Sequence, residues 1–291
     1  MYERVIKCTN ADNVEMQLGN TTSPWFIQEV AGLYTVRNNV NVEDNSMTDG
    51  ASYIGSNTQK RNIMLYLAEY EGDHMANRDQ LYRVFKTKTK GTFTYYEGST
   101  TKIINYYVES LECTSMAPFK ATISLICPDP FFVDPYNTSV VMSGWVPKWT
   151  FIHHFKEGGE IMGDLLVEKL KDIDNESGMD NIGLTIELNA SDTCVNPRVL
   201  KFQSGEYIQI GTTDNPFTLQ PLDKLTITTS QGDKNVRLTR DGVTTKVNQY
   251  LDEGSTYLML SNGLNTFRYS AASGEDYLTV TIIFRNRYAG V

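Results

Sequence analysis

Residues 118–135 read P-F-K-A-T-I-S-L-I-C-P-D-P-F-F-V-D-P, and this stretch divides the chain into two parts. In its first half, Phe119, Ala121, Ile123, Leu125 and Cys127 fall on one face of a strand, with mostly polar side chains between them. Such a period of two predicts a strand that buries one face. Three prolines follow, and each removes a backbone donor and restricts the residue before it. We therefore predict that the strand ends here and that a stiff apolar joint leads into a second domain.

The part before the joint, residues 1–135, is predicted to be an α+β domain, because one helix pattern interrupts a series of strand patterns. The helix is expected at residues 77–86, capped by Asn77 with Gln80 three positions on. The run I-M-L-Y-L at residues 63–67 is apolar on both faces, which predicts a strand covered on both sides. Further strands are predicted at residues 2–8, 14–18, 92–96 and 102–112, and core positions at Trp25, Ile27, Tyr34, Val36, Val40 and Val42.

Residues 43–58, E-D-N-S-M-T-D-G-A-S-Y-I-G-S-N-T, are predicted to form a long polar loop. A structureless loop of this length within a compact domain is more often functional or interfacial than idle. Tyr53 and Ile54 are its sizeable apolar side chains after residue 48, and its glycines supply flexible points. We expect a contact with another subunit or with a partner protein here, and its candidate residues are Asp49, Gly50, Tyr53, Ile54 and Gly55.

The part after the joint has a different pattern. Residues 136–178 read as an irregular linker and the start of the second domain, with a short helix expected at residues 162–170. From residue 179 to residue 291, short alternating runs are separated by turn signals such as Gln231–Gly232 and Asp241–Gly242. Many short strands with regular turns predict an antiparallel β-sandwich. The chain as a whole is therefore predicted to be mainly β.

No motif in the sequence points to catalysis, a cofactor or a metal. The nucleophile elbow, zinc-protease, phosphate-loop and dinucleotide patterns are all missing. The four cysteines do not have metal-ligand spacing, and the adjacent His153 and His154 would face opposite ways on a strand. His74 is expected at the surface rather than in a metal site. We therefore expect no enzymatic activity and no cofactor.

The charge of the chain argues against a nucleic-acid or membrane ligand. The formal net charge is −9, spread evenly over both halves. The basic run K-T-K-T-K at residues 86–90 reads as a solvated turn after the helix rather than as a polyanion contact. The N-terminus lacks the layout of a secretory signal, and no apolar run approaches membrane-spanning length.

Four places in the chain resemble the distal tail proteins of long-tailed, siphovirus-type bacteriophages. They are D-G-A-S-Y-I-G at residues 49–55 with the strand after Arg61, R-D-Q-L-Y-R-V-F-K at residues 78–86, C-P-D-P-F-F at residues 127–132, and the run from residue 241 to R-Y-A-G-V at residues 287–291. No single one is specific, but their order and spacing cover nearly the whole chain. Residues 136–178 match least well.

This resemblance implies a structural virion protein. It implies a ring-forming N-terminal domain, a galectin-like C-terminal sandwich at residues 179–291, and a homohexameric ring. The ring would join the tail tube protein to the baseplate hub, the tail-associated protein and the receptor-binding protein, with a channel through which DNA passes without specific binding. The location implied is the tail tip of the virion, with assembly in the host cytoplasm.

Two other functions stay open from sequence. A carbohydrate-binding module that recognises host cell-wall glycans would need exposed tryptophan or tyrosine on a concave sheet face. A cell-wall hydrolase would need paired carboxylates that only the fold could bring together. The galectin likeness concerns fold and does not by itself imply sugar binding.

Overall fold

The computed structural model of the chain describes residues 4–19, 23–147, 163–167 and 169–291. The chain separates into two compact units. The first unit consists of Met1–Pro135 together with Arg287–Val291, and the second unit of Tyr136–Asn286. From the sequence, the second domain was predicted to extend to the C-terminus. The structure differs there, because the last five residues return to the first unit.

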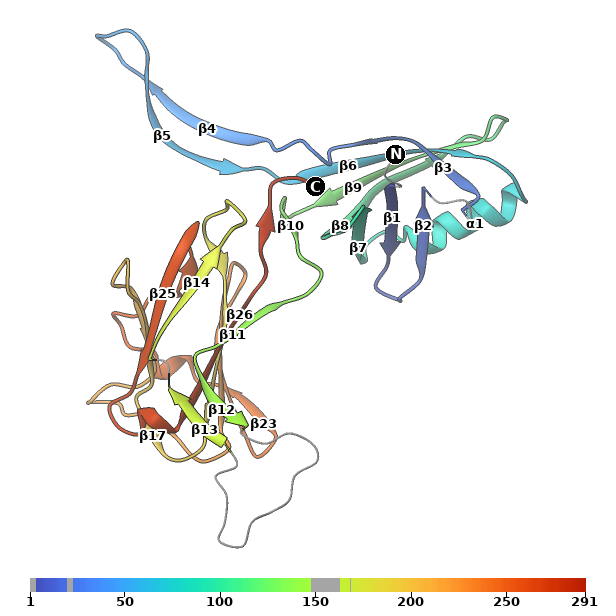
Figure 1. Cartoon of the computed structure of the whole chain (residues 1–291). Helices are drawn as coiled ribbons and strands as arrows, with labels where there is room; N and C mark the ends of the chain where they lie inside the picture. The colour runs from blue at the N-terminus through green and yellow to red at the C-terminus, as the bar shows by residue number, and fades with distance from the viewer. Residues whose placement is uncertain (1–3, 20–22, 148–162, 168) are drawn as a thin grey trace, which may run out of the picture. The chain divides into compact units, whose positions relative to one another are not determined.

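The first unit is built on one antiparallel sheet, ordered β2-β1-β7-β8-β9-β6-β3, to which β10 and β27 are added beside β8 (Figure 1). Helix α1, His74–Val84, lies between β6 and β7 in the chain and packs into the same core. The strands are β1 Arg4–Thr9, β2 Glu15–Leu18, β3 Trp25–Ala31, β6 Arg61–Glu69, β7 Lys90–Glu97, β8 Thr100–Cys113, β9 Lys120–Cys127, β10 Phe132–Val133 and β27 Arg287–Tyr288.

The predicted strand that opens residues 118–135 is confirmed as β9, which lies between β6 and β8. Ala121, Ile123, Leu125 and Cys127 are buried, as their alternation predicts. The apolar joint after it is partly a strand. Phe132 in β10 is fully buried in the core of the first unit. The sequence around the prolines therefore contributes to the first core as well as ending the strand.

The strand that was expected to be covered on both sides, β6, is buried on one face only. Ile63, Leu65 and Leu67 are fully buried, whereas Met64 and Tyr66 on the opposite face are half-buried. The prediction from apolar residues on both faces of the strand was therefore wrong about the second face, which is only half-buried.

Helix α1 starts three residues before the predicted start. Its N-cap is Asp73, whose Oδ1 accepts hydrogen bonds from the backbone N–H groups of Met75 at 2.9 Å and Ala76 at 3.5 Å. The predicted cap, Asn77, is wrong. Its side chain instead donates to Glu69 Oε1 and to the carbonyl of Glu71. Aspartate and asparagine are about equally good caps, so sequence alone did not discriminate between the two positions.

The second unit is a β-sandwich with one continuous core. A six-stranded sheet, β11-β26-β16-β21-β22-β23, packs on a four-stranded sheet, β14-β25-β18-β19. Strands of these sheets are β11 Thr138–Val141, β14 Leu170–Asn175, β16 Thr185–Ala190, β18 Arg198–Lys201, β19 Tyr207–Gln209, β21 Lys224–Ser230, β22 Asp233–Arg240, β23 Val243–Lys246, β25 Gly263–Ser270 and β26 Leu278–Phe284. The predicted fold class, mainly β with an α+β first part and a C-terminal sandwich, is confirmed.

Short pairs and turns complete the sandwich. The pairs are β12 Ser143–Pro147 with β13 Gly163–Val167, β15 Ile182–Gly183 with β24 Met259–Leu260, and β17 Cys194–Val195 with β20 Thr218–Leu219, and the 3-10 helices are η1 Asn248–Tyr250 and η2 Glu275–Tyr277. The helix predicted at residues 162–170 is wrong, because residues 163–167 pair with β12 as a strand. An isolated helix of that length would be marginal, and ladder pairing satisfies the same backbone groups. His153 and His154 lie outside the described residues.

The two units are joined by two chain segments rather than one. On the side of the first unit, Phe132 pairs with Tyr288 and Val133 with Arg287. On the side of the second unit, Thr138 pairs with Phe284. The outgoing and returning segments are thus held side by side within each unit.

The returning C-terminal segment is fixed by side chains of the first unit. The Lys102 ammonium lies 3.3 Å from the centre of the Tyr288 ring and 2.6 Å from Asp134 Oδ1. The Tyr288 hydroxyl donates to Asp134 Oδ2 at 3.2 Å. Arg287 forms an ion pair with Asp129. Through these contacts the C-terminal residues contribute to the stability of the first unit in which they lie.

Arg61 binds four backbone carbonyls from three distant segments. Its Nε donates to Pro130 O at 2.6 Å, and its Nη1 donates to Gly32 O at 2.6 Å and to Leu33 O at 2.8 Å. Its Nη2 donates to Ala289 O. The side chain is 4% exposed, and burial lowers the pKa of the guanidinium. The guanidinium suits this position because its planar fork presents five fixed donors.

The approach of the chain to Arg61 depends on a glycine. Gly32 has a φ of +90°, and a Cβ at this position would lie 2.0 Å from the carbonyl oxygen of Asn62. Any other residue would push the segment away from β6 and move two of the carbonyls that Arg61 binds.

We expect Arg61→Ala to destabilise the protein by about 3 kcal/mol or more, because four buried or partly buried carbonyls lose their donor together. Arg61→Lys should recover part of the loss, since an ammonium has three donors. Urea unfolding followed by tryptophan fluorescence measures both. The matched control is Lys60→Ala, at the neighbouring exposed position. If Arg61→Ala and Lys60→Ala unfold at the same urea concentration, the hydrogen bonds of Arg61 do not stabilise the first unit.

Candidate assembly surface

Residues 38–58 form a two-stranded ribbon that projects from the sheet of the first unit (Figure 1). It consists of β4, Asn38–Asp44, and β5, Ala51–Thr58. The predicted structureless loop at residues 43–58 is therefore wrong. These polar residues pair across the ribbon through their backbones, and only residues 45–50 form the connecting turn.

All five candidate contact residues lie on this ribbon. Asp49 and Gly50 are in the connecting turn, where Gly50 has a φ of +94° and its carbonyl accepts from Asn45 N at 3.1 Å. Tyr53, Ile54 and Gly55 are on β5. The register shifts beside them, where Asn41 pairs with Gly55 and Val42 with Tyr53, so that Ile54 is the extra residue of a bulge.

The ribbon exposes an unusual amount of apolar surface. Tyr53 and Ile54 are each 65% exposed, and Met47 in the turn is 94% exposed. Val40 and Val42 are also more than half exposed. Tyr34, Val36, Val40 and Val42 were predicted in the core, and that prediction is wrong for all four. Of these residues only Val40 and Val42 lie in a strand, and the alternation of apolar residues does not say whether such a strand is covered.

A two-stranded ribbon on its own is at best marginally stable in water. This ribbon keeps both outer strand edges unpaired among the described residues, and it has no core of its own. Unpaired edges and exposed apolar side chains are the features that strand addition or another protein contact uses. The arrangement therefore suits an assembly contact, which is what the sequence led us to expect at this segment.

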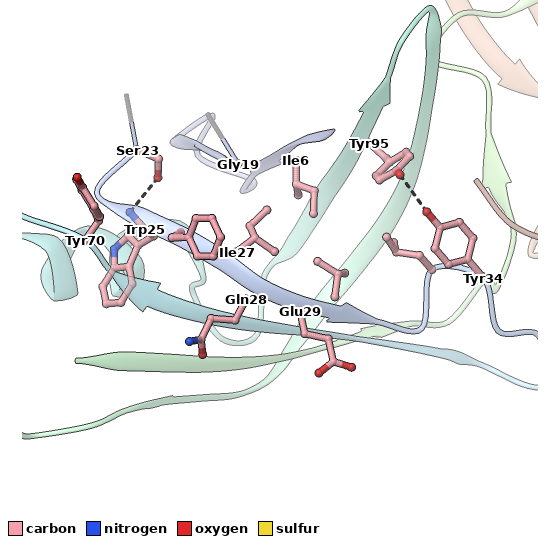
Figure 2. A pocket seen from close by; sticks show the side chains of 13 residues that line it. Ile6, Gly19, Ser23, Trp25, Ile27, Gln28, Glu29, Tyr34, Tyr70 and Tyr95 are labelled. Carbon is pink, nitrogen blue, oxygen red and sulfur yellow. Dashed lines mark hydrogen bonds between the residues drawn. The ribbon is translucent and has the colours of Figure 1, made fainter. Parts of the chain in front are cut away.

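A groove of about 780 Å³ lies along β3 in the same unit (Figure 2). Trp25 in its wall is 1% exposed, and its indole N–H has no hydrogen-bond acceptor among the described residues. At the other end the Tyr34 hydroxyl lies 3.1 Å from that of Tyr95, which donates to Glu97 at 3.0 Å. Burial raises the pKa of Tyr95. The lining is mostly apolar and aromatic, which suits binding rather than a reaction, and sequence analysis did not detect it.

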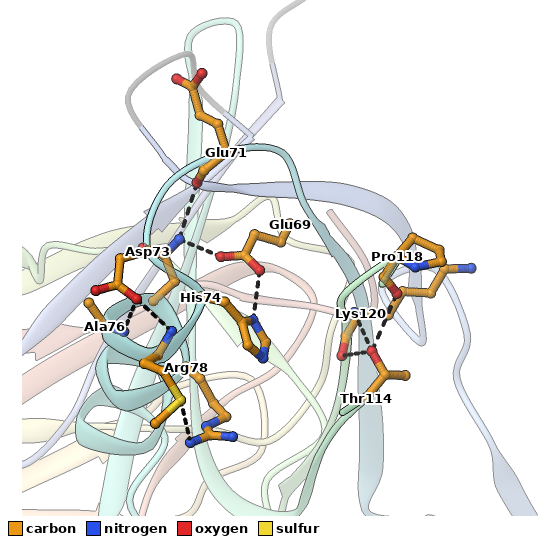
Figure 3. A network of polar contacts seen from close by, with 11 residues as sticks. Glu69, Glu71, Asp73, His74, Ala76, Arg78, Thr114, Pro118 and Lys120 are labelled. Atoms are coloured by element: carbon orange, nitrogen blue, oxygen red, sulfur yellow. Dashed lines mark hydrogen bonds and ion pairs between the residues drawn. The ribbon is translucent and has the colours of Figure 1, made fainter. Parts of the chain in front are cut away.

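A polar network fixes the start of helix α1 (Figure 3). The His74 ring is stacked on Phe119 with the ring centres 3.5 Å apart, and its Nδ1 lies 2.8 Å from Glu69 Oε2. Asn77 donates to the other oxygen of the same carboxylate. Each group of this network thus has a structural partner, and among the residues that the structure describes no serine, threonine or cysteine hydrogen-bonds to His74 or Glu69. His74 is half-buried rather than free at the surface.

The cysteines of the described chain are not reactive groups. All four are free thiols. Burial raises the pKa of Cys127 and of Cys194 to about 12, and it raises the pKa of Cys8 as well. A thiol that stays protonated is a poor nucleophile and a poor metal ligand. Among the described residues no cluster of histidine, cysteine or carboxylate side chains could hold a metal ion, and no helix is long and apolar enough to span a membrane.

Residues 177–288 match the family model of the siphovirus-type tail component, C-terminal domain. The matched residues lie almost entirely in the second unit. This match confirms the resemblance to the distal tail proteins of long-tailed bacteriophages. A comparison with curated protein sequences gives no match.

Solved structures extend the likeness over the whole chain. The crystal structure of the SPP1 Dit protein, described as a paradigm of the hub adsorption apparatus in phages that infect Gram-positive bacteria, is similar with a TM-score of 0.68. The match has 11% identity and covers 97% of this chain and 99% of that one. A chain of the phage P2 baseplate in its activated conformation with Ca is similar with a TM-score of 0.53 and 10% identity, covering 99% of both chains. At these identities the likeness concerns the fold.

We expect the double substitution Tyr53→Ser and Ile54→Ser to leave folding unchanged and to weaken assembly. Both side chains are mostly exposed in the single chain, so their loss should change its stability by less than about 0.5 kcal/mol. Burying two such side chains in a contact contributes on the order of a few kcal/mol. Thermal unfolding and light scattering measure the two effects.

The control for this experiment is Val243→Ser with Leu264→Ser, two similarly exposed positions in the second unit. It should change neither property. If the ribbon variant assembles at the same protein concentration as the wild-type chain, the contact lies elsewhere.

Proposed function

We propose that this chain is a structural adaptor of a phage tail. Six copies form a ring that joins the tail tube to the baseplate hub and the receptor-binding apparatus. The observation that carries the proposal is the match of residues 177–288 to a siphovirus-type tail component domain. It is supported by the likeness of almost the entire chain to the fold of the SPP1 Dit protein.

The first unit supplies the ring contact in this proposal. A ring needs a heterologous interface, in which one surface of a subunit meets a different surface of the next. The projecting ribbon, with its exposed apolar side chains and unpaired edges, is suited to reach a neighbouring subunit. The candidate contact residues Asp49, Gly50, Tyr53, Ile54 and Gly55 are assigned to this contact or to one with the tail tube.

The ring has a central channel through which DNA passes without being bound tightly. Each phosphate neutralised by lysine or arginine would raise the affinity for DNA by a salt-dependent amount. A chain of net charge −9 is compatible with passage. The location that follows is the tail tip of the virion, after assembly in the host cytoplasm.

The described sandwich strands do not favour the alternative of a carbohydrate-binding module. Within the strands of its two main sheets, the tryptophan and tyrosine residues are Tyr207 and Tyr269. Tyr269 is buried, and Tyr207 is half-buried under Arg198 and donates to Asp252 at 2.8 Å. Neither presents an open ring face on which a sugar could stack. Binding and structural support, rather than catalysis, are also the roles that the groove and the ribbon suit.

We expect the purified chain to form a particle of about six times 32.9 kDa. Light scattering gives the mass, and negative-stain images should show rings with a central hole. A protein that stays monomeric at tens of micromolar would contradict the ring proposal.

We expect the first unit alone to form the ring when Pro135 is joined to Arg287 by a short glycine-serine linker. The two ends are adjacent because Val133 pairs with Arg287, so the linker need not span a distance. Truncation after Pro135 is the informative comparison. It removes β27 and the Ala289 carbonyl from Arg61, and should be less stable. A linked first unit that is folded but monomeric would show that the ring needs the sandwich.

A further inference from the structure

The tip of the ribbon carries charge of one sign only. Residues 38–58 contain Glu43, Asp44 and Asp49, and no lysine or arginine. All three carboxylates are exposed, and none forms an ion pair with a described residue. An exposed contact element with unbalanced charge favours a partner surface of the opposite sign.

The same unit has such a surface, which we call the basic surface. It consists of Lys88 in the turn after α1, Lys90 at the start of β7, and Tyr107, which pairs with Lys90 on β8. All three side chains are exposed. The neighbouring Lys86 is paired with Asp12 at 2.9 Å, whereas Lys88 and Lys90 form no ion pair with a described residue.

The two surfaces also share an apolar component. Met47, Tyr53 and Ile54 are exposed beside the acidic groups of the ribbon. Tyr107 is 42% exposed beside Lys90. Charged groups with exposed aromatic or methionine side chains among them are typical of protein interfaces, in which the apolar part supplies affinity and the charges supply orientation.

We propose that the acidic tip of the ribbon of one copy docks on the basic surface of a second copy. The inference rests on the proposed ring and names the contact that closes it. The acidic tip and the basic surface are different parts of one unit. Each copy therefore gives one contact and receives one, as a closed ring requires.

A nucleic acid is the other ligand that the basic surface could bind. Phosphates would neutralise Lys88 and Lys90, but they would leave the acidic tip and its apolar side chains without a partner. A second copy of the chain satisfies both surfaces with one contact. The charge pattern therefore favours the second copy.

The test is a charge swap in the full-length chain. The tip variant is Glu43→Lys with Asp49→Lys, and the surface variant is Lys88→Glu with Lys90→Glu. We expect each variant alone to weaken self-association by more than about tenfold, because like charges then face each other. The chain that carries all four substitutions should assemble again, and so should an equimolar mixture of the two variants. Light scattering measures assembly, and circular dichroism checks folding.

Further variants and conditions complete the test. The neutral pair Glu43→Gln with Asp49→Asn should give a smaller loss than the tip variant. Asp174→Lys with Asp214→Lys, two exposed positions in the second unit, should have no effect. Wild-type assembly should weaken as salt rises, because exposed charges are screened.

Each outcome decides the proposal. Wild-type assembly of both single variants, or loss in both without recovery in the mixture, overturns the docking while leaving the ring intact. Loss of DNA binding in the surface variant with normal assembly would assign the surface to nucleic acid and overturn it too. A wild-type chain that stays monomeric would instead contradict the ring itself.

Discussion

The first unit depends on one buried guanidinium. Arg61 stands at the start of β6, directly after the ribbon, and it binds the carbonyls of the segment before the ribbon, of the joint and of the returning C-terminus. Its face also lies 4.9 Å from the ring of Phe132. A buried cation without a carboxylate is tolerable only because carbonyls surround it. One residue therefore holds three segments that lie far apart in the sequence. All three must be in place for the guanidinium to make its full set of hydrogen bonds.

This constraint separates a rigid part of the unit from an incomplete one. Around Arg61 the carbonyls of three chain segments accept hydrogen bonds and Phe132 is buried. A few residues away, the ribbon exposes Tyr53, Ile54 and Met47 and pairs only with itself. A rigid base with an unsatisfied projecting element is what an assembling subunit needs, because the base fixes the direction in which the ribbon is presented.

Much of the fold could be predicted from sequence, and its errors have physical causes. The alternation at residues 119–127 identified β9 because a one-sided core fixes side-chain parity. The same reasoning failed at Val40 and Val42, since a strand pattern does not reveal whether a neighbour covers it. The ribbon was read as a loop because its asparagine, serine and glycine residues have low strand propensity, although backbone pairing does not require apolar side chains. The candidate residues lie on this ribbon, and their role in a contact stays a prediction. The groove at Trp25 was not predicted, because its walls come from strands far apart in sequence.

The pair of chain segments between the units has a mechanical consequence. A pull on the sandwich is shared by two covalent connections, and each is anchored on the first unit by β10 or by β27. The Tyr288 ring under Lys102 and the Arg287–Asp129 ion pair resist withdrawal of the C-terminal segment. A domain tethered by one segment can swivel about a single bond, whereas two parallel tethers oppose twisting. Torque applied to the sandwich would therefore reach the sheet of the first unit instead of being lost in a flexible linker.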